Sequence, residues 1–207
     1  MKNDFYRWTR DLHLYFGLFV SPFILVFAAS VFFLNHGKVT APGWGAPETF
    51  RDLRIPEGIA QLQGRESVDS AREILPQVRL TGEIAFVRVL RKEQHLVIAV
   101  AKPRFEATVD VDLTSESGVV STRTTGWWEA LAYLHKSPGP HNVDIRGNWF
   151  WTRAWGLLAD TTIYLTLFIS ITGVYLWYVI RAERRVGLWL LGAGAASFFG
   201  IIYAVVR

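Results

Sequence analysis

The sequence predicts a membrane α-helical protein, in which three transmembrane helices carry a water-exposed α+β domain between the first and second helices. Three observations lead to this fold class. Hydrophobic residues make up 51% of the 207 residues, and they gather in long runs at the two ends of the chain. The middle of the chain instead has the alternation and turn residues of a soluble domain. Aromatic residues sit at the edges of the apolar runs, where their rings settle at a membrane–water interface.

The first apolar run extends from Leu14 to Leu34 and is interrupted only by Ser21, Pro22 and Ser30. At about 1.5 Å per residue it spans roughly 31 Å, close to the thickness of one hydrocarbon core. A cleaved signal peptide is the alternative, but its apolar region is only about 7–15 residues long. We therefore expect residues 1–36 to form a cytoplasmic N-terminus and an uncleaved transmembrane helix.

Two further segments, residues 154–180 and 186–207, are apolar and long enough to cross a bilayer. The loop between them, residues 181–185, contains three arginines, and the N-terminal segment is also basic. Basic segments next to membrane helices stay in the cytoplasm. This rule places the loop and the N-terminus inside, and residues 37–153 and the C-terminus outside the cytoplasm.

Residues 37–153 should form the extracytoplasmic domain with its connectors. The stretch 37–66 is rich in Gly and Pro, which favours an irregular connector. A Ser start, helical spacing of apolar residues and a closing Pro76 predict a short helix over residues 67–75. Apolar runs predict three strands, over residues 84–90, 96–100 and 107–113. The later segment 127–135 has the spacing of a helix. A helix followed by an antiparallel meander gives a small α+β unit.

Several classes of function are excluded by what the sequence lacks. There is no cysteine, so disulfides, thiolate metal sites, iron–sulfur clusters and covalent c-type haem are ruled out. No phosphate loop, HExxH, GxSxG or dinucleotide fingerprint occurs. The net charge of +4 is modest and the basic residues are scattered, so no nucleic-acid partner is expected. If electrons pass through this protein, a partner has to supply them.

The five histidines are the main candidates for chemistry. His13 and His36 lie roughly 34 Å apart along a continuous helix and cannot share one metal. His36 and His135 each end a segment that leads into or out of the membrane, so we expect both near the outer face, with His141 close to them. Two imidazoles, one on each side of a porphyrin, are what six-coordinate haem requires. Histidines at such positions are also common as plain boundary residues, and that alternative stays open.

Asp160 falls about one turn inside the outer end of the second transmembrane helix. A carboxylate at membrane depth is a functional hypothesis by default, and this one is placed to accept a hydrogen bond from a ligating histidine. The alternative is that it pairs with Arg153 or reaches interfacial water. His95 lies among charged neighbours in a strand–turn region, which predicts a surface position.

Four stretches of the sequence share a pattern with one known family. Residues 11–18 (DLHLYFGL) are similar to an LHxxxGL opening of a first membrane helix, and residues 34–36 (LNH) close that helix. Residues 110–120 look like the end of a PepSY module. Leu134-His135 and residues 171–177 (ITGVYLW) are similar to an "LH … TGxxlW" block. Together these stretches resemble the PepSY-associated transmembrane family.

The resemblance implies a small PepSY-TM-like protein of the bacterial inner membrane, with a PepSY-like domain on the periplasmic side. Some larger relatives bind haem b through paired histidines and reduce ferric siderophores, whereas others have no assigned activity. By this likeness haem b would bind His36 and His135, with His13 and His141 as further candidates and Asp160 as their hydrogen-bond acceptor. The third helix lacks a histidine, which departs from the larger relatives and argues against two haems.

Two functions follow as hypotheses. The first is a haem-linked electron carrier, which takes electrons from a partner redox donor and passes them to an outer acceptor such as ferric iron. The second is a non-catalytic interaction module or an accessory subunit of a larger membrane complex. Gly192, Ala196 and Gly200 support the second hypothesis if their face packs on another subunit, although packing on this protein's own first two helices is the favoured alternative. Transport is a weaker hypothesis, because three helices cannot enclose a substrate path alone.

Overall fold

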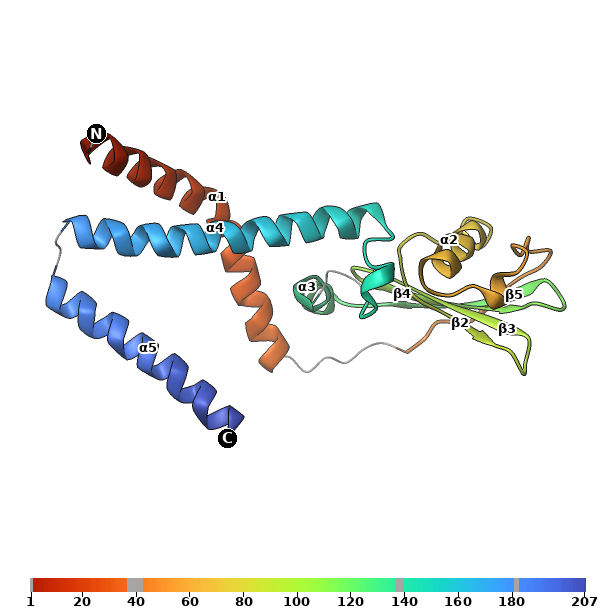
Figure 1. The fold of residues 1–207 in the computed structure, drawn as a ribbon. Helices are drawn as coiled ribbons and strands as arrows, with labels where there is room; N and C mark the ends of the chain where they lie inside the picture. Colours follow the sequence, from red (N-terminus) through yellow and green to blue (C-terminus); the bar gives the residue numbers. More distant parts are fainter. Residues whose placement is uncertain (1, 37–42, 137–139, 181–182) are drawn as a thin grey trace. The chain divides into compact units, whose positions relative to one another are not determined.

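The computed structural model describes residues 2–36, 43–136, 140–180 and 183–207. The chain forms two compact units, Phe23–Thr161 and a second unit made of Met1–Pro22 with Thr162–Arg207. Figure 1 labels the elements in chain order. They are α1 (Lys2–His36), β1 (Glu48–Phe50), η1 (Ile59–Gln61), α2 (Gly64–Ile74), β2 (Glu83–Leu90), β3 (His95–Lys102), β4 (Phe105–Asp112), β5 (Ser117–Thr124), α3 (Trp127–Lys136), η2 (Val143–Ile145), α4 (Phe150–Ile180) and α5 (Arg184–Val206).

The strands form one antiparallel sheet in the order β1-β5-β4-β3-β2. Strands β2 to β5 follow one another as a meander, because tight turns connect neighbours that are also adjacent in sequence. The alternation seen in the sequence decides which face of each strand is buried. In β3 the side chains of Leu96, Ile98 and Val100 are buried, and the residues between them are half-buried.

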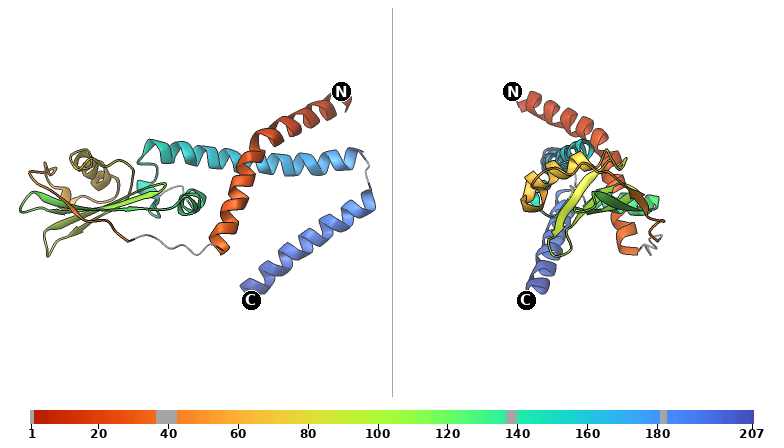
Figure 2. Two further views of the ribbon diagram at one scale, coloured as in Figure 1. Left: turned by 180° about the vertical axis from the view of Figure 1, so that it is seen from behind. Right: turned by 90° about the vertical axis from the view of Figure 1, so that its right-hand side faces the viewer.

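One face of the sheet is covered by α2, as Figures 1 and 2 show from several directions. The apolar stripe of this helix consists of Val68, Ala71 and Ile74, all buried against the sheet. Each large apolar side chain buried in this way contributes roughly 1.5–3 kcal/mol. The hydrophobic core of the domain therefore lies between α2 and the sheet.

The predicted short helix and the three predicted strands are all present, with small differences at their ends. Residues 37–66 were interpreted as an irregular connector, of which residues 37–42 lie outside the described part of the structure. The rest contains a short strand, the one-turn helix η1 and the start of α2 at Gly64. Residues Glu48–Phe50 form the edge strand β1, paired with residues 118–120 of β5. This strand has no alternating pattern of its own, and it forms because the edge of β5 offers unpaired backbone groups.

Three helices are long and apolar enough to cross a membrane, with mean hydropathy between 1.8 and 2.1: Asp4–Phe32, Phe150–Ile180 and Arg184–Val206. Their large apolar side chains are mostly exposed, which an aqueous protein would not tolerate on this scale. The chain is therefore a multi-pass membrane protein. Hydroxyl side chains within α4 bond back to carbonyl groups of their own helix, as expected in lipid: Thr161, Thr166 and Ser170.

Candidate functional site

The last turn of α3 holds His135 against α1. The Nδ1 atom of His135 lies 2.9 Å from Ser30 Oγ. The Phe27 ring, one turn earlier on α1, stands edge-on to the imidazole at 5.6 Å between centroids. Ser30 is almost fully buried, at 2% exposure, and His135 is half-buried. Phe27, Ser30, His135 and Trp155 are called the His135 cluster below.

Trp155 of α4 completes this cluster. Its Nε1–H group donates to Leu134 O at 3.0 Å, and its ring lies 5.9 Å from that of Phe27. The last carbonyl groups of a helix have no partner within the helix, so the indole supplies one at the end of α3. The backbone next to His135 is fixed by this bond, while the imidazole is fixed by Ser30. Three elements that are distant in sequence thus position one histidine.

A second histidine has a comparable environment in the other unit of the chain. His13 Nδ1 lies 2.8 Å from Thr172 Oγ1 on α4. The edge of the imidazole faces Gly173, where an added Cβ would lie 3.4 Å from His13 Cε1. Phe16 and Phe168 pack edge to face next to it, at 5.4 Å between ring centroids. His13 is half-buried and Thr172 is 9% exposed.

The other predicted site residues are placed less distinctively. His36 is the final residue of α1, and its side chain lies outside the described part of the structure. Its pairing with His135 therefore stays a prediction. His141 is exposed. Asp160 is exposed on α4 and, within the described residues, forms no hydrogen bond with a histidine. No group of three His, Cys, Asp or Glu side chains in the described ranges is arranged to hold a bare metal ion.

His95 has a partner that the sequence did not reveal. Its Nδ1 lies 2.7 Å from Asp110 Oδ1 on the neighbouring strand β4. The hydrogen bond to Asp110 raises the pKa of His95, and the charges of Asp112 and Glu93 add to the same effect. The pair lies on the solvent side of the sheet and is partly exposed. His95 is a surface residue, as predicted, and it belongs to no cofactor site that the geometry supports.

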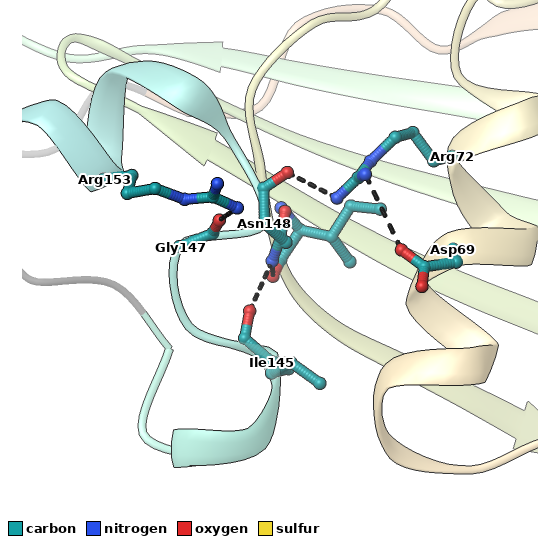
Figure 3. A network of polar contacts seen from close by, with 7 residues as sticks. Asp69, Arg72, Ile145, Gly147, Asn148 and Arg153 are labelled. Carbon is teal, nitrogen blue, oxygen red and sulfur yellow. Dashed lines mark hydrogen bonds and ion pairs between the residues drawn. The ribbon is translucent and has the colours of Figure 1, made fainter.

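A network of polar contacts joins the edge of the sheet to the start of α4 (Figure 3). The Asn148 side chain pairs with strand β2 as a further strand would. Its Oδ1 accepts from Ile84 N–H at 2.9 Å, and its Nδ2 donates to Ile84 O and Ile145 O, both at 2.8 Å. Arg72 of α2 donates to Asn148 O and lies 3.6 Å from Asp69. These contacts position the domain edge and the first turn of α4.

Glu83 lies under the same connection and is only 1% exposed. Its Oε1 accepts from Gly147 N–H at 3.0 Å, and Arg153 donates to Gly147 O at 2.9 Å. Burial raises the pKa of the Glu83 carboxyl, although hydrogen bonds from Thr152, Asn148 and Gly147 partly oppose this rise. Within the described residues Glu83 forms hydrogen bonds with this connection and with no histidine, so the buried carboxyl is a structural element of the connection.

Sequence reasoning did not identify Ser30 as a partner of a histidine. It appeared only as a polar interruption of an apolar run, and its contact with His135 joins positions 105 residues apart. Thr172 bonds both to its own helix and across to His13. The sequence could show only that a small polar residue lies within a membrane helix. It could not show which residue this side chain contacts, because the contact forms in the tertiary structure.

Comparison with known proteins gives one match. A family described as PepSY_TM-like has a model that matches residues 7–207. No curated protein and no solved structure matches the chain significantly.

Proposed function

The chain belongs to the PepSY_TM-like family, and on this basis we propose that it binds b-type haem through His135 and carries electrons across or along the membrane. The family match covers nearly the whole chain and confirms the resemblance drawn from the four sequence stretches. The family and the three apolar helices establish a membrane protein. Haem and electron transfer are the proposal, and the following observation supports it.

The proposal rests on one observation, that the Nε2 atom of His135 is available to bind a metal. Nδ1 contacts Ser30, and no described side chain forms a hydrogen bond with Nε2. The imidazole packs against the Phe27 ring, which in turn contacts the Trp155 ring, an apolar setting of the kind that holds haem. His135 would supply one of the two neutral imidazoles that a six-coordinate b-type haem requires.

The residues that would hold the haem are His135 and His36, with His141 and His13 as further candidates. Bound haem would supply a one-electron couple. The chain itself supplies the ligands, keeps water away through Phe27 and Trp155, and fixes the imidazole through Ser30. Asp160 remains a proposed acceptor for a ligating histidine. A redox partner must deliver the electrons, and an outer acceptor such as ferric iron or a ferric siderophore would receive them.

The orientation in the membrane is part of the proposal. Arginines precede and begin α5, and basic residues occupy the first turns of α1, so both segments should be cytoplasmic. The sheet domain and the C-terminus are then on the periplasmic side of an inner membrane. This arrangement would place the His135 cluster at the periplasmic end of the membrane helices.

The visible spectrum of the full-length protein, expressed with haem supplied and purified in detergent, tests the proposal. We expect a Soret band and, after reduction with dithionite, sharp α and β bands. His135→Ala and His36→Ala should each abolish the six-coordinate spectrum. His95→Ala is the matched control, because that histidine pairs with Asp110 in the sheet and should be neutral for haem. A wild-type protein without a Soret band would rule out the proposal.

An accessory role in a larger membrane complex is the second candidate, and α5 is the observation that favours it. None of its described side chains is buried, and an added Cβ at Gly192 or Gly200 would meet no atom within 4 Å. The small-residue face therefore does not contact this protein's own described residues. Purification in mild detergent would distinguish the two roles. A stable co-purifying membrane subunit, lost in Gly192→Leu, supports an accessory role, whereas a haem-loaded chain without partners contradicts it.

A further inference from the structure

Two histidines in separate units of the chain contact the same kind of group. His135 Nδ1 faces the Ser30 hydroxyl at 2.9 Å, and His13 Nδ1 faces the Thr172 hydroxyl at 2.8 Å. Ser30 and Thr172 are both buried, with residue exposures of 2% and 9%. Because water has little access to either oxygen, these contacts govern where each imidazole carries its proton.

Each hydroxyl group already has an acceptor for its own proton. Ser30 Oγ donates to Phe27 O at 2.7 Å on α1, and Thr172 Oγ1 donates to Phe168 O at 2.7 Å on α4. A hydroxyl carries one donor hydrogen and two acceptor lone pairs. While its hydrogen points into the helix, its oxygen can only accept from the imidazole. The ring proton of each histidine is then on Nδ1.

A neutral imidazole with its proton on Nδ1 has its free lone pair on Nε2. No described residue forms a hydrogen bond with Nε2 of His13 or of His135. Metal-ligating histidines have this arrangement, in which one nitrogen donates its hydrogen to a fixed acceptor and the other binds the metal. Gly173 leaves the ring edge of His13 open, since a side chain there would contact Cε1.

We propose that Ser30 and Thr172 are positioning residues, which hold the protons of His135 and His13 on Nδ1 and present the Nε2 atom of each histidine as a neutral ligand, each for a separate metal centre. For His135 the identity of that centre as haem rests on the proposed function. The position of the proton does not depend on haem, because it follows from hydrogen bonds within the protein.

The competing arrangement has each hydroxyl rotated to donate to Nδ1. It gives one hydrogen bond per site in place of two, because the helix carbonyl loses the hydroxyl proton. One additional hydrogen bond in a poorly solvated site favours the proposed tautomer by roughly tenfold, or about 1.4 kcal/mol. A free imidazole instead favours the proton on Nε2, so removal of the hydroxyl should reverse the preference.

The test is the tautomer of each histidine in the haem-free, full-length protein in detergent micelles, read from the nitrogen-15 shifts of the ring. The spectra should be recorded in a mildly alkaline buffer. We expect the proton on Nδ1 at His13 and His135 in the wild type. Ser30→Ala should move it to Nε2 at His135 alone, and Thr172→Val should move it at His13 alone.

The chain offers matched controls for both variants. Ser21 and Thr166 bond back to their own helices in the same way and, within the described ranges, form no hydrogen bond with a histidine. Ser21→Ala and Thr166→Val should leave both tautomers unchanged. Ser30→Thr and Thr172→Ser retain the hydroxyl and should retain the wild-type tautomers. An Nε2 proton in the wild type, or no change in either hydroxyl-deleted variant, would overturn the proposal.

A haem titration of the same proteins separates this inference from the proposed function. If His135 binds haem, Ser30→Ala should weaken the affinity roughly ten- to hundredfold, the usual effect of losing a group that orients a ligand. Ser21→Ala should not weaken it. If the tautomers change as expected but no variant binds haem, the positioning role is supported and the haem proposal is contradicted.

Discussion

At the scale of single residues, Glu83 and His95 show how one domain treats charge in two ways. Glu83 is buried, and burial raises the pKa of its carboxyl because the charged form loses its water. His95 is at the surface, and the carboxylate of Asp110 raises its pKa by stabilising the charged form. The ionised Glu83 carboxylate lowers the stability of the folded domain at neutral pH. Protonated His95 raises this stability, at pH values below the folded pKa of His95.

The effect of Glu83 on folding should depend on pH with a definite sign. Its pKa in the folded state is above the ordinary value of 4.5. Its favourable contribution is complete below pH 4.5 and is lost as the pH rises through the raised folded value. Glu83→Gln keeps an acceptor for Gly147 N–H but cannot ionise. We therefore expect it to stabilise the domain at pH 8 by on the order of 1 kcal/mol, with little change at pH 4.

Hydrogen exchange of the β2–β5 amides in the full-length protein measures this effect, with variant and wild type compared at equal pH. Glu83→Ala is the informative contrast, because it leaves Gly147 N–H without its partner and should cost about 1–3 kcal/mol. If Glu83→Gln destabilised the domain at both pH values, the ionised carboxylate would stabilise the folded domain, which would contradict this prediction.

At the scale of elements, the connection between the domain and α4 depends on Asn148. Its amide pairs with both backbone groups of Ile84 on the edge strand β2 and with Ile145 O, and Arg72 binds its carbonyl. An unpaired strand edge is open to association with other chains. Asn148 therefore protects the edge of the sheet and fixes the entry into the membrane helix at the same time.

Replacement of Asn148 by Ala should destabilise this connection by about 2–4 kcal/mol, since three hydrogen bonds are lost and Ile84 is left unpaired in a buried site. Hydrogen exchange should rise most strongly in β2 and in residues 143–149. Asn142→Ala is the control, because that side chain only caps a short exposed turn at Asp144. Equal exchange in both variants would contradict the role assigned to Asn148.

The sequence was sufficient for most elements of the fold but not for the contacts that build the site. Periodicity located the three long helices, α2, α3 and the strands β2, β3 and β4, because each pattern is local. Strand β1 was missed, since only its pairing with β5 makes it a strand. The contacts of Ser30 with His135 and of Asn148 with Ile84 join distant positions, and no local pattern could indicate them. The four family stretches did predict the family correctly.

At the scale of the whole molecule, the chain combines a water-exposed sheet domain with helices that require lipid. The proposed topology follows from the basic residues beside α1 and α5. The absence of native cysteine makes this topology directly testable, because a single introduced cysteine is the only reactive thiol.

Glu93→Cys and Arg185→Cys place that thiol at exposed positions, in the turn between β2 and β3 and in the second residue of α5. A maleimide that cannot cross the inner membrane should label Glu93→Cys in spheroplasts and label Arg185→Cys only after lysis. The cysteine-free wild type is the control for background labelling. The opposite pattern would place the sheet domain in the cytoplasm and remove the basis for an outer electron acceptor.

Restoration of the haem spectrum by free imidazole in His135→Gly is the most direct measurement of the central claim, that His135 is an axial ligand. The full-length protein with haem supplied should lose its six-coordinate spectrum in this variant and regain it when imidazole fills the vacated position. His95→Gly should retain the wild-type spectrum with or without imidazole. An unchanged spectrum in His135→Gly before any imidazole is added would contradict the account.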